Sequence, residues 1–181
     1  MATPFRPALA LLAQYAAYHR DRRNIATHFV GVPMIVFAVG VLLAGARWHV
    51  AGLALTPAWA LFAVVSLWYL TRGAAALGLA TSLAMGVLIA LAHRVGQGSA
   101  SAWLAWGLGC FVAGWIIQFI GHYYEGRKPA FADDLVGLLV APLFLVLEGL
   151  APLGLFRPLM REVEQRVGPT LIRDLAHPAT R

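Results

Sequence analysis

The sequence predicts an all-α integral membrane protein, a bundle of four transmembrane helices with an N-terminal amphipathic helix and a re-entrant or interfacial segment. Hydrophobic residues make up 60% of the 181 residues and charged residues only 12%, whereas soluble domains carry about a quarter charged residues. Four uncharged runs come close to the roughly 20 residues that a helix needs to cross a bilayer. The length suits a single membrane domain over residues 1–181.

The N-terminal segment, residues 5–24, is predicted to form the amphipathic helix. Leu9, Leu12, Ala16 and His19 recur at helical spacing, which is typical of a helix that lies on a membrane surface. The apolar stretch is short and several charges soon follow it, so we do not expect a cleaved signal peptide.

The four uncharged runs are the predicted transmembrane helices. Their connections are short, so neighbouring helices are expected to pack antiparallel. Small residues recur at Gly78, Ser82 and Gly86 in the third span, and at Gly107, Cys110, Gly114 and Gly121 in the fourth. This pattern predicts close helix packing. The predicted spans are residues 29–46, 50–70, 73–92 and 98–121.

A fifth apolar run, residues 135–148, is predicted to be re-entrant or interfacial, because it is shorter and contains Pro142. Basic residues support this choice. With a cytoplasmic N-terminus and four spans, most arginines fall on the cytoplasmic side, including those of the basic tail at residues 157–181. The composition is rich in alanine and glycine. We therefore expect a multi-pass protein of a bacterial inner membrane with both termini and the functional site on the cytoplasmic face.

Charge and cysteine content exclude some classes of protein. The net charge of +6 does not indicate nucleic-acid binding, because the sequence offers no soluble basic domain. The single cysteine, Cys110, excludes an internal disulfide and a cysteine-based zinc site.

The histidines point to a metal site. His19, His28 and His122 all fall at the cytoplasmic ends of their predicted helices. Neutral imidazole is the commonest metal ligand, and three imidazoles can hold a divalent first-row metal with positions left open for substrate or oxygen. The other histidines, for which no role is expected, are His49, His93 and His177.

His19 and His28 can share a metal only if the helix breaks between them. Nine residues apart, they would lie about half a turn out of phase on one continuous helix. The stretch "RDRRN", residues 20–24, can supply the break, with Asp21 or Asn24 capping the next helix.

More polar residues accompany these histidines. Gln118, His122 and Glu125 share one helical face, and Asn24 lies one turn before His28. Glu125 could complete a two-histidine, one-carboxylate set or orient an imidazole as a hydrogen-bond acceptor. Alternatively, all these residues could simply be interfacial groups that seal helix ends.

Two stretches that contain these residues resemble the signature blocks of the 2-hydroxy fatty acid dioxygenase family. They are "YHRDRRNIATHFVGVP", residues 18–33, and "WIIQFIGHYYEGRKPA", residues 115–130, and a similar "APLFLVLE" segment follows at residues 141–148. The matching residues are Tyr18, His19, Asn24, His28, Gly31 and Pro33 in the first block, and Trp115, Gln118, Phe119, Gly121, His122, Glu125, Pro129 and Ala130 in the second.

The resemblance implies an Fe(II)-dependent enzyme of fatty acid alpha-oxidation, which uses O2 to shorten a 2-hydroxy fatty acid by one carbon. His19, His28 and His122 would then be metal ligands, and Asn24, Gln118 and Glu125 would have catalytic roles. The acyl tail would lie in the bilayer or between spans. Basic residues could attract the substrate carboxylate or serve only to orient the protein; they are Arg20, Arg22, Arg23, Arg127 and Lys128.

Two other functions compete with this interpretation. A b-type cytochrome could hold haem between His28 and His122. The other competing function is that of a non-enzymatic multi-span scaffold or transporter. The predicted spans contain no charged residue, which argues against ion transport. Membrane di-iron enzymes use more histidines than the six here. The sequence leaves open whether Glu125 or His19 is the third ligand, and also the substrate chain length, its stereochemistry, the one-carbon product and the oligomeric state.

Overall fold

The structure, a computed structural model, describes residues 4–46, 48–50, 53–128 and 135–175. The described part is helical apart from one small antiparallel hairpin, in which His49 lies opposite Ala54. The all-α prediction is therefore confirmed in its main feature. The elements are α1 (Ala8–Ala16), α2 (Arg22–Leu43), β1 (Trp48–Val50), β2 (Leu53–Leu55), α3 (Pro57–Leu70), α4 (Ala75–Gly96), α5 (Ala100–Glu125), α6 (Val136–Leu150) and α7 (Arg157–Val167).

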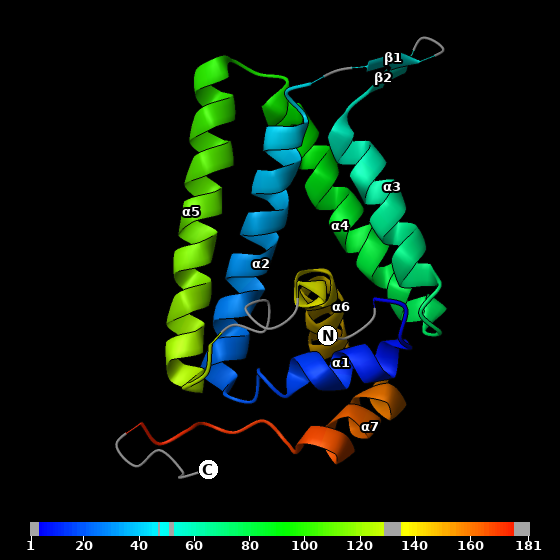
Figure 1. The fold of residues 1–181 in the computed structure, drawn as a ribbon, viewed down its shortest axis with the longest axis vertical. Coiled ribbons are helices and arrows are strands. Elements are labelled where there is room, and N and C mark those ends of the chain that lie inside the picture. Colours follow the sequence, from blue (N-terminus) through cyan, green and yellow to red (C-terminus); the bar gives the residue numbers. More distant parts are fainter. Residues whose placement is uncertain (1–3, 47, 51–52, 129–134, 176–181) are drawn as a thin grey trace.

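Three long helices, α2, α4 and α5, are long and apolar enough to cross a membrane. α2 packs against both α5 and α4, and α3 lies beside α4 (Figure 1). Large apolar side chains such as Leu83 and Val112 are exposed on the outer faces of these helices. Exposed apolar surface of this extent suits contact with lipid.

The second predicted span, residues 50–70, is wrong as a single helix. Its first residues belong to the hairpin, and α3 begins only at Pro57. Proline fits the first turn of a helix but disfavours helical backbone at the residue before it, here the extended Thr56. The 14 residues of α3 reach about 21 Å, short of a hydrocarbon core of about 30 Å. In the described part, three helices rather than four have the dimensions of a span.

The predicted amphipathic helix over residues 5–24 is wrong in its extent. α1 ends at Ala16 and α2 begins at Arg22, so the chain breaks between them. The predicted cap at Asp21 is confirmed, because its side chain accepts a hydrogen bond from the backbone N–H of Arg23 at 2.8 Å. Most of α1 is buried against α6 and α7. It is therefore part of the core rather than a helix that only lies on a surface.

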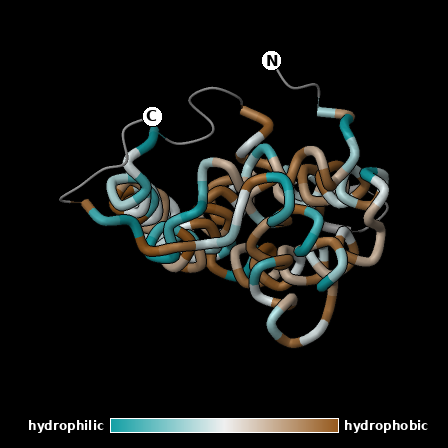
Figure 2. The backbone as a smooth tube through the Cα atoms, turned by 90° about the horizontal axis from the view of Figure 1, so that it is seen from below, coloured by the Kyte–Doolittle hydropathy of each residue, from teal (hydrophilic) through white to brown (hydrophobic). Residues whose placement is uncertain are grey.

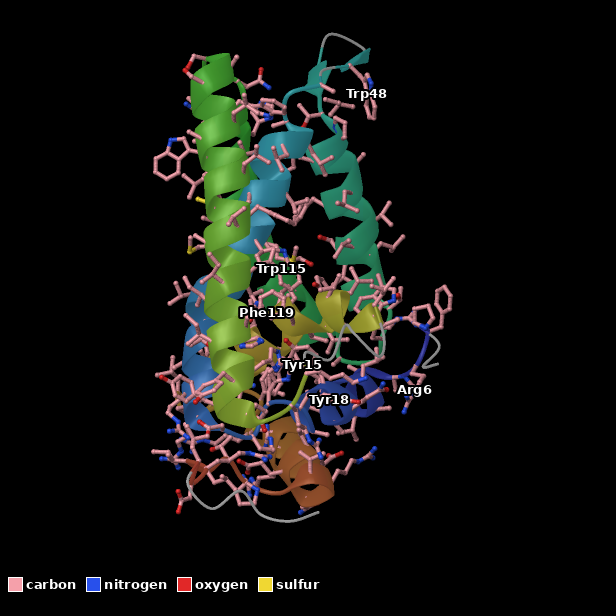
Figure 3. All side chains as sticks on the ribbon, turned by 60° about the vertical axis from the view of Figure 1, so that its left-hand side comes forward. Arg6, Tyr15, Tyr18, Trp48, Trp115 and Phe119 are labelled. Carbon is pink, nitrogen blue, oxygen red and sulfur yellow. The ribbon has the colours of Figure 1, made fainter. Side chains whose placement is uncertain are left out.

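α6 lies across the bundle instead of along it. Figure 1 shows α6 almost end-on while α2 and α5 run vertically, and Figure 3 shows the same helix from the side. It contains Pro142, and its buried Leu143, Phe144 and Leu147 belong to the main hydrophobic cluster. This orientation suits the predicted re-entrant or interfacial segment better than a fifth span.

The two ends of the bundle differ. At the lower end of Figure 1, which we call the α1 end, α1, α6 and α7 close the bundle; the hairpin marks the opposite, hairpin end. Seen from the α1 end in Figure 2, hydrophilic stretches of chain lie among more hydrophobic ones. α7 lies in the predicted tail at residues 157–181, of which residues 176–181 are outside the described part.

Candidate metal centre

Three imidazoles meet at the α1 end, from the turn after α1 (His19), from α2 (His28) and from α5 (His122). The Nε2 atoms of His19 and His28 are 3.1 Å apart. The ring of His122 lies 5.0 Å from the ring of His19 and 5.1 Å from that of His28. All three are buried, with ligand atoms within 4.8 Å of one another. Two ligands at right angles, each about 2.1 Å from an ion, would be about 3.0 Å apart. The His19 and His28 nitrogens match this spacing, and a shift of the His122 ring toward them would let one ion bind all three.

Backbone hydrogen bonds fix the tautomers of two of these rings. The Nδ1–H of His19 donates to the carbonyl of Tyr15, and the Nδ1–H of His28 donates to the carbonyl of Asn24, both at 2.8 Å. A carbonyl can only accept, so in each neutral ring Nε2 carries the lone pair. Two lone pairs that face each other at 3.1 Å repel, and a cation that both coordinate removes the repulsion. This donor set fits a metal ion.

His19 is held neutral by its surroundings. Burial first, and then repulsion from His28, lower the pKa of His19 well below its usual value. The Tyr15 ring stacks on the imidazole with centroids 4.0 Å apart, and Phe144 lies 5.9 Å away. A neutral imidazole is the form that binds a metal.

The turn that carries His19 is itself held from several sides. Arg127 donates to the carbonyl of Ala17 at 2.8 Å. Arg20 donates to the carbonyl of Ala16 and forms an ion pair with Glu148 at 3.6 Å. Burial alone would raise the pKa of Asp21, but hydrogen bonds from Arg23 and from the backbone of Arg173 outweigh it and lower the pKa to about 2.

Glu125 supports the turn instead of facing the histidine cluster. Its side chain is fully buried, and Oε2 accepts hydrogen bonds from the backbone N–H groups of Arg20 and Asp21 at 2.9 and 2.8 Å. Its Oε1 pairs with the guanidinium of Arg173 at 3.0 Å. Both oxygens are therefore engaged away from the cluster. Of the two roles left open by the sequence, this geometry favours support of the histidine-bearing turn over metal ligation.

Asn24 joins the turn to α2 and α5. Its amide donates to Glu125 Oε2 at 3.1 Å and to the carbonyl of Tyr18 at 3.2 Å. Its own carbonyl accepts from His28. Asn24 therefore binds Glu125 with its side chain and orients the ring of His28, a candidate metal ligand, with its backbone carbonyl.

Close packing of α2 on α5 sets the distance between His28 and His122. A Cβ added at Gly31 would come within 2.9 Å of the carbonyl oxygen of Gly114, and one added at Gly114 would come within 2.7 Å of Ile35. Larger residues at these positions would push the helices apart. The predicted packing role of Gly114 is confirmed, and Gly31 is its partner on α2.

A cavity of about 410 Å³ opens from the histidine cluster. Gln118, which is almost wholly buried, lines it beside the histidines, and its Oε1 has no hydrogen-bond partner among the described residues. Away from this polar end the wall is apolar. It includes Val32, Ile35, Val36, Val39 and Leu43 of α2, Leu61 and Val65 of α3, and Phe111 and Trp115 of α5. Trp115 is labelled in Figure 3 on α5.

The basic residues expected to attract a carboxylate do not line this cavity. Arg20 pairs with Glu148, Arg23 pairs with Asp21 at 2.8 Å, and Arg127 binds the carbonyl of Ala17. None of Arg20, Arg22, Arg23, Arg127 and Lys128, which the sequence offered for attraction of the carboxylate or for orientation of the protein, is among the lining residues.

The other sequence-predicted residues lie elsewhere. His93 is near the hairpin end, His49 lies in β1, and His177, Pro129 and Ala130 fall outside the described residues. Sequence reasoning missed Tyr15 and Arg173. Tyr15 lies one helical turn before His19, where a stacking partner can be looked for. Arg173 is one of several arginines in a basic tail, and no local signal singles it out.

The chain is similar to known proteins over most of its length. The chain matches the family described as "2-hydroxy-palmitic acid dioxygenase Mpo1-like" over residues 5–151. It is 34% identical, over 91% of its own length and 87% of the relative's, to the 2-hydroxy-palmitic acid dioxygenase MPO1 of Saccharomyces cerevisiae. No solved structure matches the chain. The protein belongs to the 2-hydroxy-palmitic acid dioxygenase Mpo1-like family.

Proposed function

We propose that this protein is an Fe(II)-dependent membrane dioxygenase that shortens long-chain 2-hydroxy fatty acids by one carbon. The observation that carries the proposal is the meeting of three buried imidazoles at the polar end of an otherwise apolar cavity. The name of the Saccharomyces cerevisiae relative supports the same substrate class.

His19, His28 and His122 are the proposed iron ligands. Bound iron would supply the activation of O2 and a docking point for the hydroxyl and carboxylate oxygens of the substrate. The backbone carbonyls that accept from Nδ1–H of His19 and His28 leave Nε2 of each ring free to bind the ion. Glu125 and Asn24 are then positioning residues that hold the turn and the ring of His28.

Gln118 is the proposed substrate-binding residue. Its Oε1, which has no hydrogen-bond partner among the described residues, can accept a hydrogen bond from the 2-hydroxyl group, and its amide N–H can donate to the carboxylate. No cationic side chain lines the cavity among the described residues. The carboxylate would therefore be neutralised by the metal rather than by an arginine.

The apolar part of the cavity would hold the acyl chain. It follows α2 from His28 to Leu43, about 22 Å at 1.5 Å per residue. An extended chain with C–C bonds of about 1.5 Å advances roughly 1.25 Å per carbon. The cavity therefore suits a chain of roughly 16 to 18 carbons, which agrees with the palmitic acid in the relative's name.

The reaction balances on O2 alone if the removed carbon leaves as carbon dioxide: RCH(OH)COOH + O2 → RCOOH + CO2 + H2O. The bond between the carboxyl carbon and C2 breaks, and the substrate supplies all four electrons that reduce O2. No further reductant is then required.

We also propose that the α1 end faces the cytoplasm. The turn before α2, the end of α5 and α7 bring Arg22, Arg23, Arg127 and Arg161 to this end, as the positive-inside rule requires. A head group held there would lie at the membrane interface while its tail entered the bundle.

The haem alternative fits this geometry less well. His19 is nearly equidistant from His28 and His122, at 4.5 and 5.0 Å between ring centroids. Its ring therefore lies near the plane midway between them, which a macrocycle between that pair would occupy. A purely structural role, in turn, does not explain why buried polar atoms of Gln118 and His122 have no hydrogen-bond partner in the described part of the chain.

The test is metal analysis and turnover of the detergent-purified protein. After anaerobic Fe(II) reconstitution, we expect about one non-haem iron per chain and conversion of 2-hydroxypalmitate to a product one carbon shorter, detected by mass spectrometry. Palmitate, which lacks the hydroxyl, is the control and should not react. Iron binding without turnover would reject the dioxygenase, and a haem spectrum would favour the cytochrome.

A further inference from the structure

We propose that the C-terminal strap, which we define as residues 168–173, is a positioning element of the metal centre, with Arg173 as its principal residue. The strap lies beyond residues 5–151, the part that matches the family. The proposal rests on the proposed function in one respect, the assignment of His19 as a ligand.

The strap pairs with the turn that carries His19 through its backbone. The N–H of Leu171 donates to the carbonyl of Arg20, and the N–H of Arg22 donates to the carbonyl of Leu171, both at 2.9 Å. These bonds form a parallel bridge between Asp21 and Leu171. The guanidinium of Arg20 also donates to the carbonyl of Gly168 at 2.8 Å. The strap thus provides partners for backbone groups on both sides of Asp21.

Arg173 adds side-chain contacts to this pairing. Its backbone N–H donates to Asp21 Oδ2 at 2.8 Å, and its carbonyl accepts from Arg23 at 2.7 Å. Its guanidinium pairs with Glu125 Oε1 at 3.0 Å. One residue therefore connects the strap to the turn and to the end of α5.

The ion pair with Glu125 carries the argument. Glu125 is fully buried, and the structure pairs its carboxylate with one cation among the described residues, Arg173. Its other oxygen holds the backbone N–H groups of Arg20 and Asp21. Loss of the Arg173 charge would leave the buried carboxylate without an ion-pair partner among the described residues. Glu125 would then move toward water and release the turn.

His19 is the candidate ligand most sensitive to such a movement. His28 and His122 lie on long helices that pack directly together, whereas His19 lies on a short turn between α1 and α2. Its position relative to the other two rings therefore depends on what holds the turn. The strap and Glu125 hold it from opposite sides of the backbone.

The test compares Arg173→Gln with Arg166→Gln. The side chain of Arg166 on α7 is exposed and forms no hydrogen bond or ion pair with another described residue, so this variant controls for loss of a positive charge. Fe(II) affinity is measured anaerobically by competition with a chelator. We expect Arg173→Gln to bind roughly 10- to 100-fold more weakly, the range for loss of a group that orients a ligand. Arg166→Gln should match the unsubstituted protein, and Arg173→Lys, which restores the charge, should recover part of the affinity.

Hydrogen exchange of the metal-free protein provides a readout independent of iron. The backbone N–H groups of Arg20 and Asp21 should exchange at least tenfold faster in Arg173→Gln, because their acceptor Glu125 is released. Exchange in the middle of α5 should not change. If the unsubstituted protein binds no iron, the proposed function fails while this comparison still decides the role of the strap.

A second variant covers the case in which Arg173→Gln does not fold. Leu171→Pro removes the N–H that bonds to Arg20, and the Leu171 side chain is exposed, so the core is unaffected. It should show the same faster exchange and weaker iron binding. Unchanged exchange and affinity in both variants would overturn the proposal.

Discussion

Polar side chains have different roles at the two ends of the bundle. At the hairpin end, polar groups mainly complete helix termini: Gln97 donates to the carbonyl of Ala44 at 2.9 Å, and Trp103 donates to that of Val41 at 3.0 Å. At the α1 end, most of the buried polar and charged residues gather at the histidine cluster and at the turn that carries His19. They are His19, Arg20, Asp21, Asn24, His28, Gln118, His122 and Glu125.

One buried histidine nitrogen at each end illustrates the difference between the two ends. His93, near the hairpin end, has a buried Nδ1 without a hydrogen-bond partner among the described residues, as does His122 at the α1 end. Within the described part of the chain, only the α1 end places such a histidine next to two further imidazoles. A single histidine with one buried nitrogen therefore indicates little, whereas convergence from three segments indicates a ligand site.

The largest expected effect is that of a histidine substitution at the α1 end, with a histidine substitution at the hairpin end as its control. His122→Ala should lower bound iron to less than about a tenth of the normal content and abolish turnover, because two imidazoles hold the ion far less tightly than three. His93→Ala should leave both unchanged. Iron is counted by mass spectrometry after desalting. Normal iron content in His122→Ala would remove it from the ligand set.

The next largest effect is expected for a substitution of Gln118. It separates substrate binding from metal binding at the α1 end. Gln118→Leu keeps the approximate volume but removes both polar groups, so kcat/KM for 2-hydroxypalmitate should fall about 10- to 100-fold, as expected for hydrogen bonds to a charged group. Iron content should not change. A parallel loss of iron would instead mean that Gln118 supports the metal.

A smaller effect is expected where the cavity approaches the hairpin end. Val39→Trp would fill the apolar cavity above the histidines, and activity toward 2-hydroxypalmitate should fall about tenfold relative to a 2-hydroxy acid of about 10 carbons. Leu67→Trp, at an exposed position of α3, is the control. An unchanged preference in a competition assay with both substrates would place the acyl chain elsewhere.

The smallest effect is expected for the close packing of α2 against α5. Gly31→Ala would force α2 away from α5 near Gly114 and should lower the free energy of unfolding by about 1–3 kcal/mol. Gly109→Ala, where an added Cβ would meet no described residue within 4 Å, should be neutral or slightly stabilising because alanine favours helix. Chemical denaturation in detergent measures both. Equal stabilities would mean that the helices adjust without cost.

The sequence by itself determined the helical, apolar character of the chain, because composition and run length report it directly. It also singled out His19, His28 and His122, since polar residues near the ends of apolar helices stand out. The break before α2 could be predicted because capping by Asp21 is a local interaction. The error at residues 50–70 arose because hydrophobicity measures apolar length and does not distinguish helix from a short hairpin.

Only the tertiary structure decided how these residues are used. Glu125 and Arg20 are 105 positions apart, and Arg173 and Asp21 are 152 apart. Contacts over such separations leave no periodic pattern, because they depend on how whole helices pack. The sequence therefore left open whether Glu125 ligates the metal or supports a ligand. The structure directs its two oxygens at the turn and at Arg173, and so links the last part of the chain to the first histidine.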